Sequence, residues 1–165
     1  VDIHDVDDIN DEGLLFDDSH IAPIVKKFRA EGVDGIMLCH ANFGTEYVCA
    51  RLARELGLPV LLWGPRDERP EPDGTRLRDS QCGLFATGKV LRRFQVPFTY
   101  MTNCRLTDPE FERGVWDFWP YAMWSRPSST LASCRWRPVR STSGPPCATR
   151  ASCSRSSIFS FRPSP

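Results

Sequence analysis

The 165-residue sequence has no excess of charge, because 21 Lys and Arg residues balance 21 Asp and Glu residues. This balance argues against a nucleic-acid-binding protein driven by overall basic charge. No apolar run approaches 18 residues, so we expect no membrane span. The start of the chain has no basic-then-apolar secretory signal, and its first residue is Val1. We therefore expect a single-domain cytoplasmic protein that is part of a longer chain and binds neither nucleic acid nor membranes.

Several motifs for catalysis and metal binding are also missing. The sequence contains no glycine-rich phosphate loop, no GxSxG and no HExxH. The three histidines His4, His20 and His40 do not have the spacing of metal ligands. The seven cysteines form no CxxC pair, and their odd number without a secretory signal argues against a disulfide framework. The sequence therefore predicts neither a zinc site nor disulfide bonds, and its thiols are expected to be buried or idle.

Charge and composition divide the chain into two unequal parts. Residues 1–117 carry 14 Lys and Arg and all 21 Asp and Glu, a net charge of −7. Residues 118–165 carry seven Arg and no acid, and Ser, Pro and Arg make up 26 of these 48 residues. This part also holds three of the five tryptophans and three of the seven cysteines, which are depleted in disordered tails. Its seven prolines are too many for a core, so its composition fits neither class.

The first half of the acidic part predicts a parallel sheet. Apolar residues spaced by 3, 4 and 7 predict a helix over residues 21–30. Short continuous apolar runs predict strands buried on both faces over 35–39 and 59–63. An amphipathic pattern between them predicts a helix over 46–56. Strand, helix and strand within about 30 residues form a βαβ unit, which requires parallel strands.

The second half continues this alternation until the pattern breaks. Residues 64–78 are rich in Pro, Gly and charge and predict a long loop, a feature that is often functional. A helix is predicted over 84–94 and a strand over 96–101. Asp108-Pro109-Glu110 is typical of a helix start. The apolar stripe that follows from Phe111 stops at Phe118.

The loop after the first predicted strand carries candidate binding residues. Asn42 and Thr45 can form hydrogen bonds with sugar hydroxyls, and Glu46 can hold a proton or a metal, because ligands bind at the carboxyl ends of parallel strands. The alternative is helix capping, with Thr45 at the cap and Glu46 facing the helix dipole. His40 titrates in a useful range, but a lone histidine is more often a hydrogen-bonded residue of the wall than a catalyst.

The loops after the other two strands add polar residues at the same edge of the sheet. Arg66 and Asp67 follow the second strand and can clamp a polar ligand or pair with another subunit. The alternative is a solvated charged loop, since surface ion pairs are weak. Thr102 and Asn103 end the third strand. Three polar strand-end loops together predict a site facing one edge of the sheet.

The basic tail has a codon pattern that suggests a change of reading frame. Met and Trp each have a single codon, so the nucleotides under residues 121–126 are partly fixed. Read one frame over, they allow Cys-Asn-Val-Val-Lys, and residues 143–154 allow Trp-Thr-Thr-Met-Cys-Asn-Glu-Gly-Glu-Leu-Leu. The sequence translated in the shifted frame again contains acidic residues and an apolar pattern, so we infer a frameshift near Trp119-Pro120. The alternative is a true basic tail that binds acidic partners.

An ordered set of segments resembles one known family. Residues 38–46, 61–68, 83–86 and 97–101 are similar to the L-fucose/L-arabinose isomerase superfamily, in its L-fucose isomerase-like branch. The shifted tail also resembles the segment that leads this family into its second domain. The resemblance implies a Rossmann-like α/β domain at the N-terminus of an aldose–ketose isomerase.

The resemblance also implies how such an enzyme works. A divalent metal, usually manganese, holds adjacent sugar oxygens as a Lewis acid, and carboxylates move a proton through an enediol. The metal ligands of the family lie in later domains, so no catalytic or metal residue is assigned here and no manganese is expected on this chain. The N-terminal domain of the family lines the sugar pocket of a neighbouring subunit in a homo-oligomer. This implies that His40, Asn42 and Phe43, with Thr45 and Glu46, face such a pocket.

The sequence therefore predicts two regions and leaves three functions open. Residues 1–118 are expected to form an incomplete α/β domain, a parallel sheet flanked by helices, that begins after its first strand. Residues 119–165 are expected to form a frameshifted, disordered tail. The first function is that of an inactive N-terminal domain of a sugar isomerase. The second is a non-catalytic module that binds a sugar or a partner, and the third is an interaction protein with a basic tail.

Overall fold

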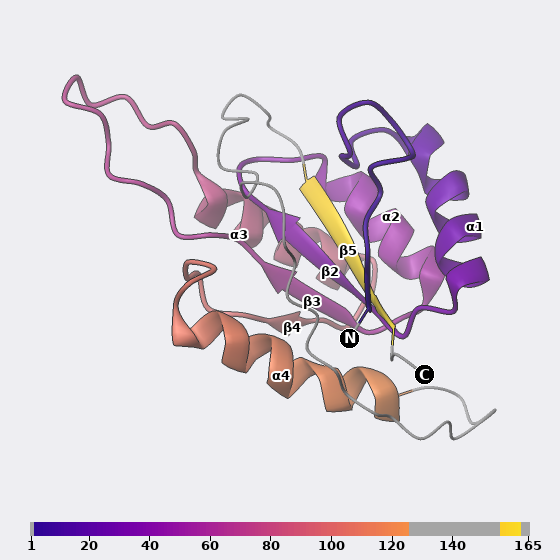
Figure 1. Cartoon of the computed structure of the whole chain (residues 1–165). Helices are drawn as coiled ribbons and strands as arrows, with labels where there is room; N and C mark the ends of the chain where they lie inside the picture. Colours follow the sequence, from indigo (N-terminus) through magenta and orange to yellow (C-terminus); the bar gives the residue numbers. More distant parts are fainter. Residues whose placement is uncertain (1, 126–155, 163–165) are drawn as a thin grey trace.

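The fold is an α/β sheet with helices on both faces (Figure 1). The computed structural model describes residues 2–125 and, for its backbone, the strand over residues 156–162. The sheet has five strands in the order β1-β5-β2-β3-β4. The strands are β1 (Asp2–His4), β2 (Gly35–His40), β3 (Val60–Trp63), β4 (Thr99–Tyr100) and β5 (Ser156–Arg162). The helices are η1 (Asp18–His20), α1 (Ile21–Glu31), α2 (Glu46–Leu56), α3 (Ser80–Arg93) and α4 (Pro109–Trp124).

The strands β2, β3 and β4 form the predicted parallel part of the sheet. Ile36 lies opposite Val60 in the β2–β3 pair, and Leu61 lies opposite Thr99 in the β3–β4 pair. All six residues of β2 and all four residues of β3 are buried. The prediction of a parallel α/β sheet flanked by helices is therefore confirmed.

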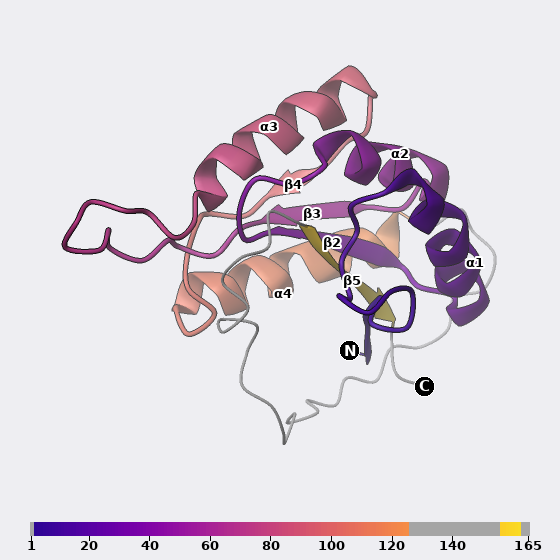
Figure 2. The same ribbon diagram turned by 90° about the horizontal axis from the view of Figure 1, so that it is seen from above.

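Alternate residues of the central strands feed two separate hydrophobic cores. Ile36 and Leu38 of β2 lie in the first core, with the inner faces of α1, α2 and α3. Met37 and Cys39 lie in the second core, under α4. Figure 2 shows α1, α2 and α3 on one face of the sheet and α4 on the other. Because side chains alternate across a strand, a sheet covered on both faces needs continuous apolar strands.

Two glycines end their helices. Gly32 follows α1 and Gly57 follows α2, each in the left-handed conformation with φ of 64°. This conformation strains residues that have a Cβ, which explains why glycine closes both helices.

Several boundaries differ from the sequence-based expectation. Helix α3 begins at Ser80 rather than at residue 84, because the Asp79 side chain accepts a hydrogen bond from the Cys82 backbone N–H (3.3 Å) and caps an earlier turn. Strand β4 is confined to Thr99–Tyr100 within the predicted 96–101. Thr45 occupies the N-cap position of α2, but its side chain makes no cap hydrogen bond, so that part of the capping prediction is wrong.

The predicted disordered tail is described only in part, and the described parts are ordered elements. Helix α4 continues to Trp124 because Phe118, Trp119 and Ala122 pack into the second core. Residues 156–162 form β5, which pairs with β1 and β2. The remaining residues of the predicted tail lie outside the described part. Within residues 2–125, no helix has both the length and the apolar composition needed to cross a membrane.

Candidate functional site

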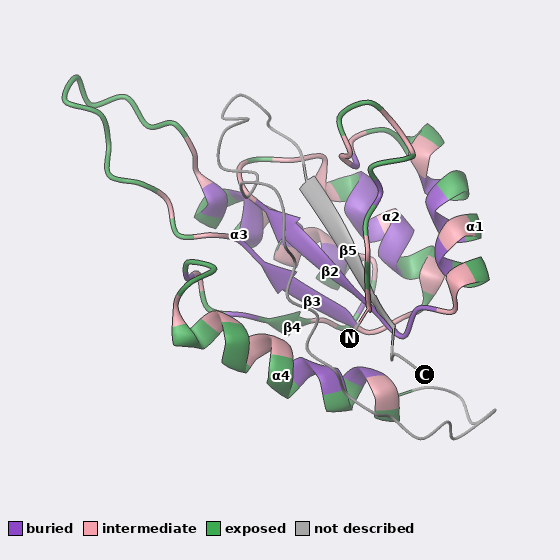
Figure 3. Cartoon of the chain, viewed as in Figure 1, coloured by how far each residue is buried: buried purple, intermediate pink, exposed green. Residues whose placement is uncertain are grey.

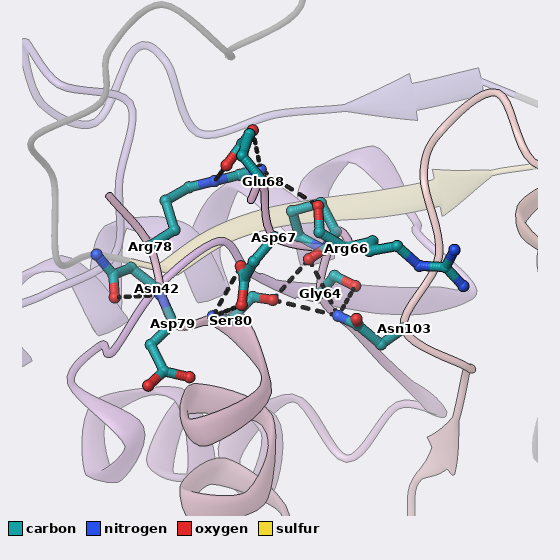
Figure 4. A network of polar contacts seen from close by, with 10 residues as sticks. Asn42, Gly64, Arg66, Asp67, Glu68, Arg78, Asp79, Ser80 and Asn103 are labelled. Atoms are coloured by element: carbon teal, nitrogen blue, oxygen red, sulfur yellow. Dashed lines mark hydrogen bonds and ion pairs between the residues drawn. The ribbon is translucent and has the colours of Figure 1, made fainter. Parts of the chain in front are cut away.

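The carboxyl ends of β2, β3 and β4 meet at one edge of the sheet, where three loops follow them. The loop between β3 and α3 is the longest, and Figure 1 shows it extending away from the body of the domain. It is largely exposed, whereas the strands from which it departs are buried (Figure 3). Side chains of these loops and of the first residue of α3 form what we call the strand-end cluster: Asn42, Asp67, Ser80 and Asn103 (Figure 4).

Asn103 and Ser80 connect the loop after β4 to the loop after β3. The Asn103 Nδ2 donates to the carbonyl oxygens of Gly64 (2.9 Å) and Pro65 (3.0 Å) and lies 3.2 Å from Ser80 Oγ. The Ser80 hydroxyl donates to the Pro65 carbonyl (2.6 Å) and is buried. These bonds satisfy backbone carbonyls at the strand end, so both side chains hold the loops in place.

Asp67 joins the same loop to the start of α3. Both of its carboxylate oxygens accept a hydrogen bond from the Ser80 backbone N–H, each at 3.1 Å. A carboxylate at a helix start is favoured by the exposed N–H groups and the helix dipole. Asp67 therefore helps to position the start of α3.

Asn42 brings the loop after β2 into the cluster. Its Oδ1 accepts hydrogen bonds from the backbone N–H groups of Phe43 (2.9 Å) and Asp79 (3.2 Å). Figure 4 shows its amide nitrogen pointing away from this network. Within the described residues that nitrogen makes no hydrogen bond, so its two N–H groups are available to a ligand. The neighbouring Phe43 side chain is 48% exposed, which places an apolar surface beside these donors.

Glycine allows two of these loops to come close enough. A Cβ at Gly83 of α3 would lie 2.4 Å from the Asn42 carbonyl oxygen. A Cβ at Gly64 would lie 2.6 Å from the His40 carbonyl oxygen. Both neighbours are backbone atoms, so neither contact can be relieved by turning a side chain.

His40 is buried beneath the cluster. Its side chain has no exposed surface, and its Nε2 lies 3.0 Å from the Thr87 hydroxyl of α3. Burial lowers its pKa from 6.5 to about 4, because the charged imidazolium is disfavoured away from water. In this arrangement His40 is a neutral wall residue at neutral pH and supports the loop that carries Asn42.

The other predicted residues lie around the cluster without joining it. Thr45 and Glu46 are half-buried at the start of α2, and neither makes a side-chain hydrogen bond within the described residues. Thr102 is exposed, as is Arg66, whose side chain points away from the network in Figure 4. The backbone N–H of Arg66 donates to the Cys104 carbonyl (3.0 Å) and extends the pairing between β3 and the segment after β4.

An ion pair that the sequence did not single out steadies the long loop. The Arg78 Nε donates to Glu68 Oε2 (2.9 Å), and its Nη2 donates to Glu68 Oε1 (2.5 Å). The Arg78 guanidinium lowers the pKa of the Glu68 carboxyl. A bidentate pair has more geometric specificity than a single contact, so it holds the two ends of the loop near each other.

The cluster does not fit a metal ion. Among the residues that the structure describes, no three His, Cys, Asp or Glu side chains gather as metal ligands. The one carboxylate of the cluster, Asp67, is already bonded to the helix start. A groove of about 580 Å³ is lined in part by Phe85, Lys89 and Tyr100 and contains no member of the cluster.

The close approach of α3 to the Asn42 loop can be tested with a matched pair of glycine variants. Gly83→Ala should lower the free energy of unfolding by about 1–3 kcal/mol, the usual cost of overpacking. Gly88→Ala in the same helix is the control. Its Cβ would meet the Phe98 ring at 3.4 Å and Leu62 Cδ2 at 3.8 Å, which are ordinary van der Waals contacts, so the gain in helix propensity should leave stability unchanged or higher by about 1 kcal/mol. Urea denaturation measures both, and equal losses would contradict the packing described.

The buried neutral state of His40 predicts a pH dependence of stability. Its pKa is about 4 in the folded chain and near the ordinary value of about 6.5 in the unfolded chain. Between these values the unfolded chain binds the extra proton, so the free energy of unfolding falls as pH falls. We expect a loss of about 2 kcal/mol between pH 7 and pH 5. Urea titrations at both pH values should show this loss for the unaltered chain and not for His40→Gln. An equal change in the free energy of unfolding for the two proteins would refute the assignment.

Comparison with known proteins identifies the domain. The family model of the fucose/sulfoquinovose isomerase N-terminal domain matches residues 1–126. Searches of curated proteins and of solved structures found no match. The matched range contains the whole strand-end cluster and confirms the resemblance carried by residues 38–46 and 61–68. The chain therefore belongs to the family of fucose/sulfoquinovose isomerase N-terminal domains.

Proposed function

We propose that this domain supplies one wall of the sugar pocket in an aldose–ketose isomerase and does not isomerise sugar by itself. The observation that carries the proposal is the free amide nitrogen of Asn42 beside the exposed Phe43 ring, at the carboxyl ends of parallel strands. Amide N–H groups donate to sugar hydroxyls, and an aromatic ring packs against the apolar C–H face of a sugar. Ligands of α/β sheets bind at this edge.

The chemistry of isomerisation needs groups that the described residues do not assemble. Proton transfer between adjacent carbons requires a base near the sugar, and manganese bound in the complete enzyme would polarise the sugar oxygens as a Lewis acid. Asp67 is held at the helix start and His40 is buried, so neither is placed to serve as that base. Base and metal ligands therefore come from other parts of the enzyme.

The proposal extends to the assembly and its location. Asn42, Phe43, Thr45 and Glu46 would face the pocket of a neighbouring subunit in a homo-oligomer. The sugar would bind as a substrate only in that complete assembly, whereas the isolated domain would bind it weakly and without turnover. We place the assembly in the cytoplasm, where thiols stay reduced; the four described cysteines, Cys39, Cys49, Cys82 and Cys104, form no disulfide bond.

The proposal includes a change of reading frame near Trp119-Pro120. Pro120 lies inside α4, where proline lacks the helical N–H donor and costs about 3 kcal/mol or more. The family match ends at residue 126, shortly after this proline. The part of the sequence without Asp or Glu begins at residue 118, shortly before it. A proline inside a helix is expected if the residues from this point on are translated from another reading frame.

The sugar-binding role can be tested on the isolated chain by NMR titration with L-fucose and with sulfoquinovose. We expect weak binding, at roughly millimolar to 100 mM sugar, that perturbs the amide signals of Asn42 and Phe43. Asn42→Asp keeps the Oδ1 acceptor for the two backbone N–H groups but removes the donors, and it should abolish the perturbation. Gln81→Glu makes the same amide-to-acid change on an exposed residue of α3 and should not.

The same samples test the absence of turnover. With Mn²⁺ added, the purified chain should form no ketose from either sugar. Ketose formation would overturn the proposal that the chain is inactive alone. No perturbation, perturbation elsewhere, or perturbation that survives Asn42→Asp would overturn the assignment of the site.

A further inference from the structure

The position between β1 and β2 is filled by a strand of unusual direction. Strand β5 pairs antiparallel with β1 on one side, with Ile3 opposite Phe161, and antiparallel with β2 on the other, with Met37 opposite Phe159. Strands β1 and β2 are therefore parallel to each other and separated by one position. Every other neighbouring pair in the sheet, β2–β3 and β3–β4, is parallel.

The order of the parallel strands matches a doubly wound sheet with one member absent. The chain runs β1, β2, β3, β4 in one direction across the sheet and skips one position after β1. Doubly wound sheets of the flavodoxin type have the order 2-1-3-4-5. Compared with that order, β1, β2, β3 and β4 occupy the positions of strands 2, 3, 4 and 5. Strand β5 occupies the position of strand 1, which we call place 1, and runs in the opposite direction.

The distribution of helices leads to the same conclusion. Crossovers between parallel strands are right-handed, so a chain that moves in one direction puts its helices on one face. Helices α1, α2 and α3 obey this rule, and α4 lies on the opposite face (Figure 2). A connection from a parallel strand at place 1 to β1 would cross the sheet in the direction opposite to that from β1 to β4. Its helix would therefore lie on the same face as α4.

The composition of β5 does not suit a strand covered on both faces. Strand β2 reads Gly-Ile-Met-Leu-Cys-His and β3 reads Val-Leu-Leu-Trp, as buried parallel strands require. Strand β5 reads Ser-Ser-Ile-Phe-Ser-Phe-Arg, with three serines and an arginine in seven residues. Its neighbour β2 is nevertheless wholly buried, and the Cβ of Ala122 in α4 lies 3.2 Å from where a Cβ on Gly35 would be.

We propose that the position between β1 and β2 is an acceptor site for a parallel apolar strand followed by an amphipathic helix, and that β5 is a substitute for it. The strand would displace β5 and form backbone hydrogen bonds with the edges of β1 and β2 that β5 now occupies, which is the strand-addition mode of peptide recognition. Its helix would cover the sheet beside α4. The carboxyl end of this site adjoins the Asn42 loop, at the switch point where doubly wound sheets bind ligands. The proposal does not depend on isomerase activity.

A synthetic peptide with the sequence of residues 58–63 and two lysines at each end is a suitable probe. This segment contains β3, which already pairs in parallel with the other edge of β2. The same peptide with Leu61→Pro and Leu62→Pro cannot complete a ladder and is the control. A nitroxide on the amino end reports direction: it should broaden the amide signals of Gly35 and Ile36 in parallel binding and those of Cys39 and His40 in antiparallel binding.

A variant of the full chain opens the site. Phe159→Pro removes a donor at the centre of β5, opposite Met37, and should release this strand from β2. We expect the probe to bind this variant about tenfold or more tightly than the unaltered chain, since β5 no longer competes. Ser133→Pro, outside the strand, should bind as the unaltered chain does. Equal affinity for the two proline variants, no binding to Phe159→Pro, or broadening at the Cys39 end would overturn the proposal.

A second measurement serves if Phe159→Pro does not fold. In the unaltered chain, a saturating excess of the probe should abolish the protection of the β5 amides from hydrogen exchange while the β2 amides stay protected. Continued protection of β5 under these conditions would overturn the proposal.

Discussion

The structure depends on the complete burial of β2. Its six residues are all buried, its side chains alternate between two hydrophobic cores, and its backbone pairs on both edges. A buried strand must satisfy every N–H and C=O group through its neighbours, because water is not available to them. The parallel partner β3, the helices on both faces and the need for a strand on the β5 side all follow from this requirement.

The candidate site is a consequence of how β2 and β3 end. Polar backbone groups emerge from the core at the carboxyl ends of these strands, and the loops must supply partners for them. Asn103 and Ser80 bind the carbonyls of Gly64 and Pro65, while Asp67 binds the start of α3. Most of the polar side chains at the edge are therefore used to fix the loops. Asn42 differs because its side-chain oxygen Oδ1 holds the loop, while its side-chain nitrogen Nδ2 is left for a ligand.

Local patterns were sufficient to predict the elements that carry the site. The spacing of apolar residues predicted α1 and α2, and the continuous apolar runs of β2 and β3 with α2 between them predicted the βαβ unit. The convergence of Asn42, Asp67 and Asn103 followed from the geometry of parallel strands. The wall role of His40 was among the sequence-based alternatives, but its partner Thr87 could not be predicted, because it is 47 residues away in the sequence. Ser80 was missed because its role depends on carbonyls of another loop, although the Asp79-Ser80 pair is a recognisable helix start.

The carboxyl-terminal part is where sequence and fold disagree most. Helix α4 continues through Pro120, and β5 enters the sheet in the direction opposite to its parallel neighbours. Both features follow if the encoded domain continues in another frame beyond residue 119. Sequencing the coding DNA across codons 115–130 tests this account most directly. The account predicts that one inserted or missing base near codon 119 restores a frame reading Cys-Asn-Val-Val-Lys, with acids returning downstream. An unbroken frame through Pro165 would contradict it.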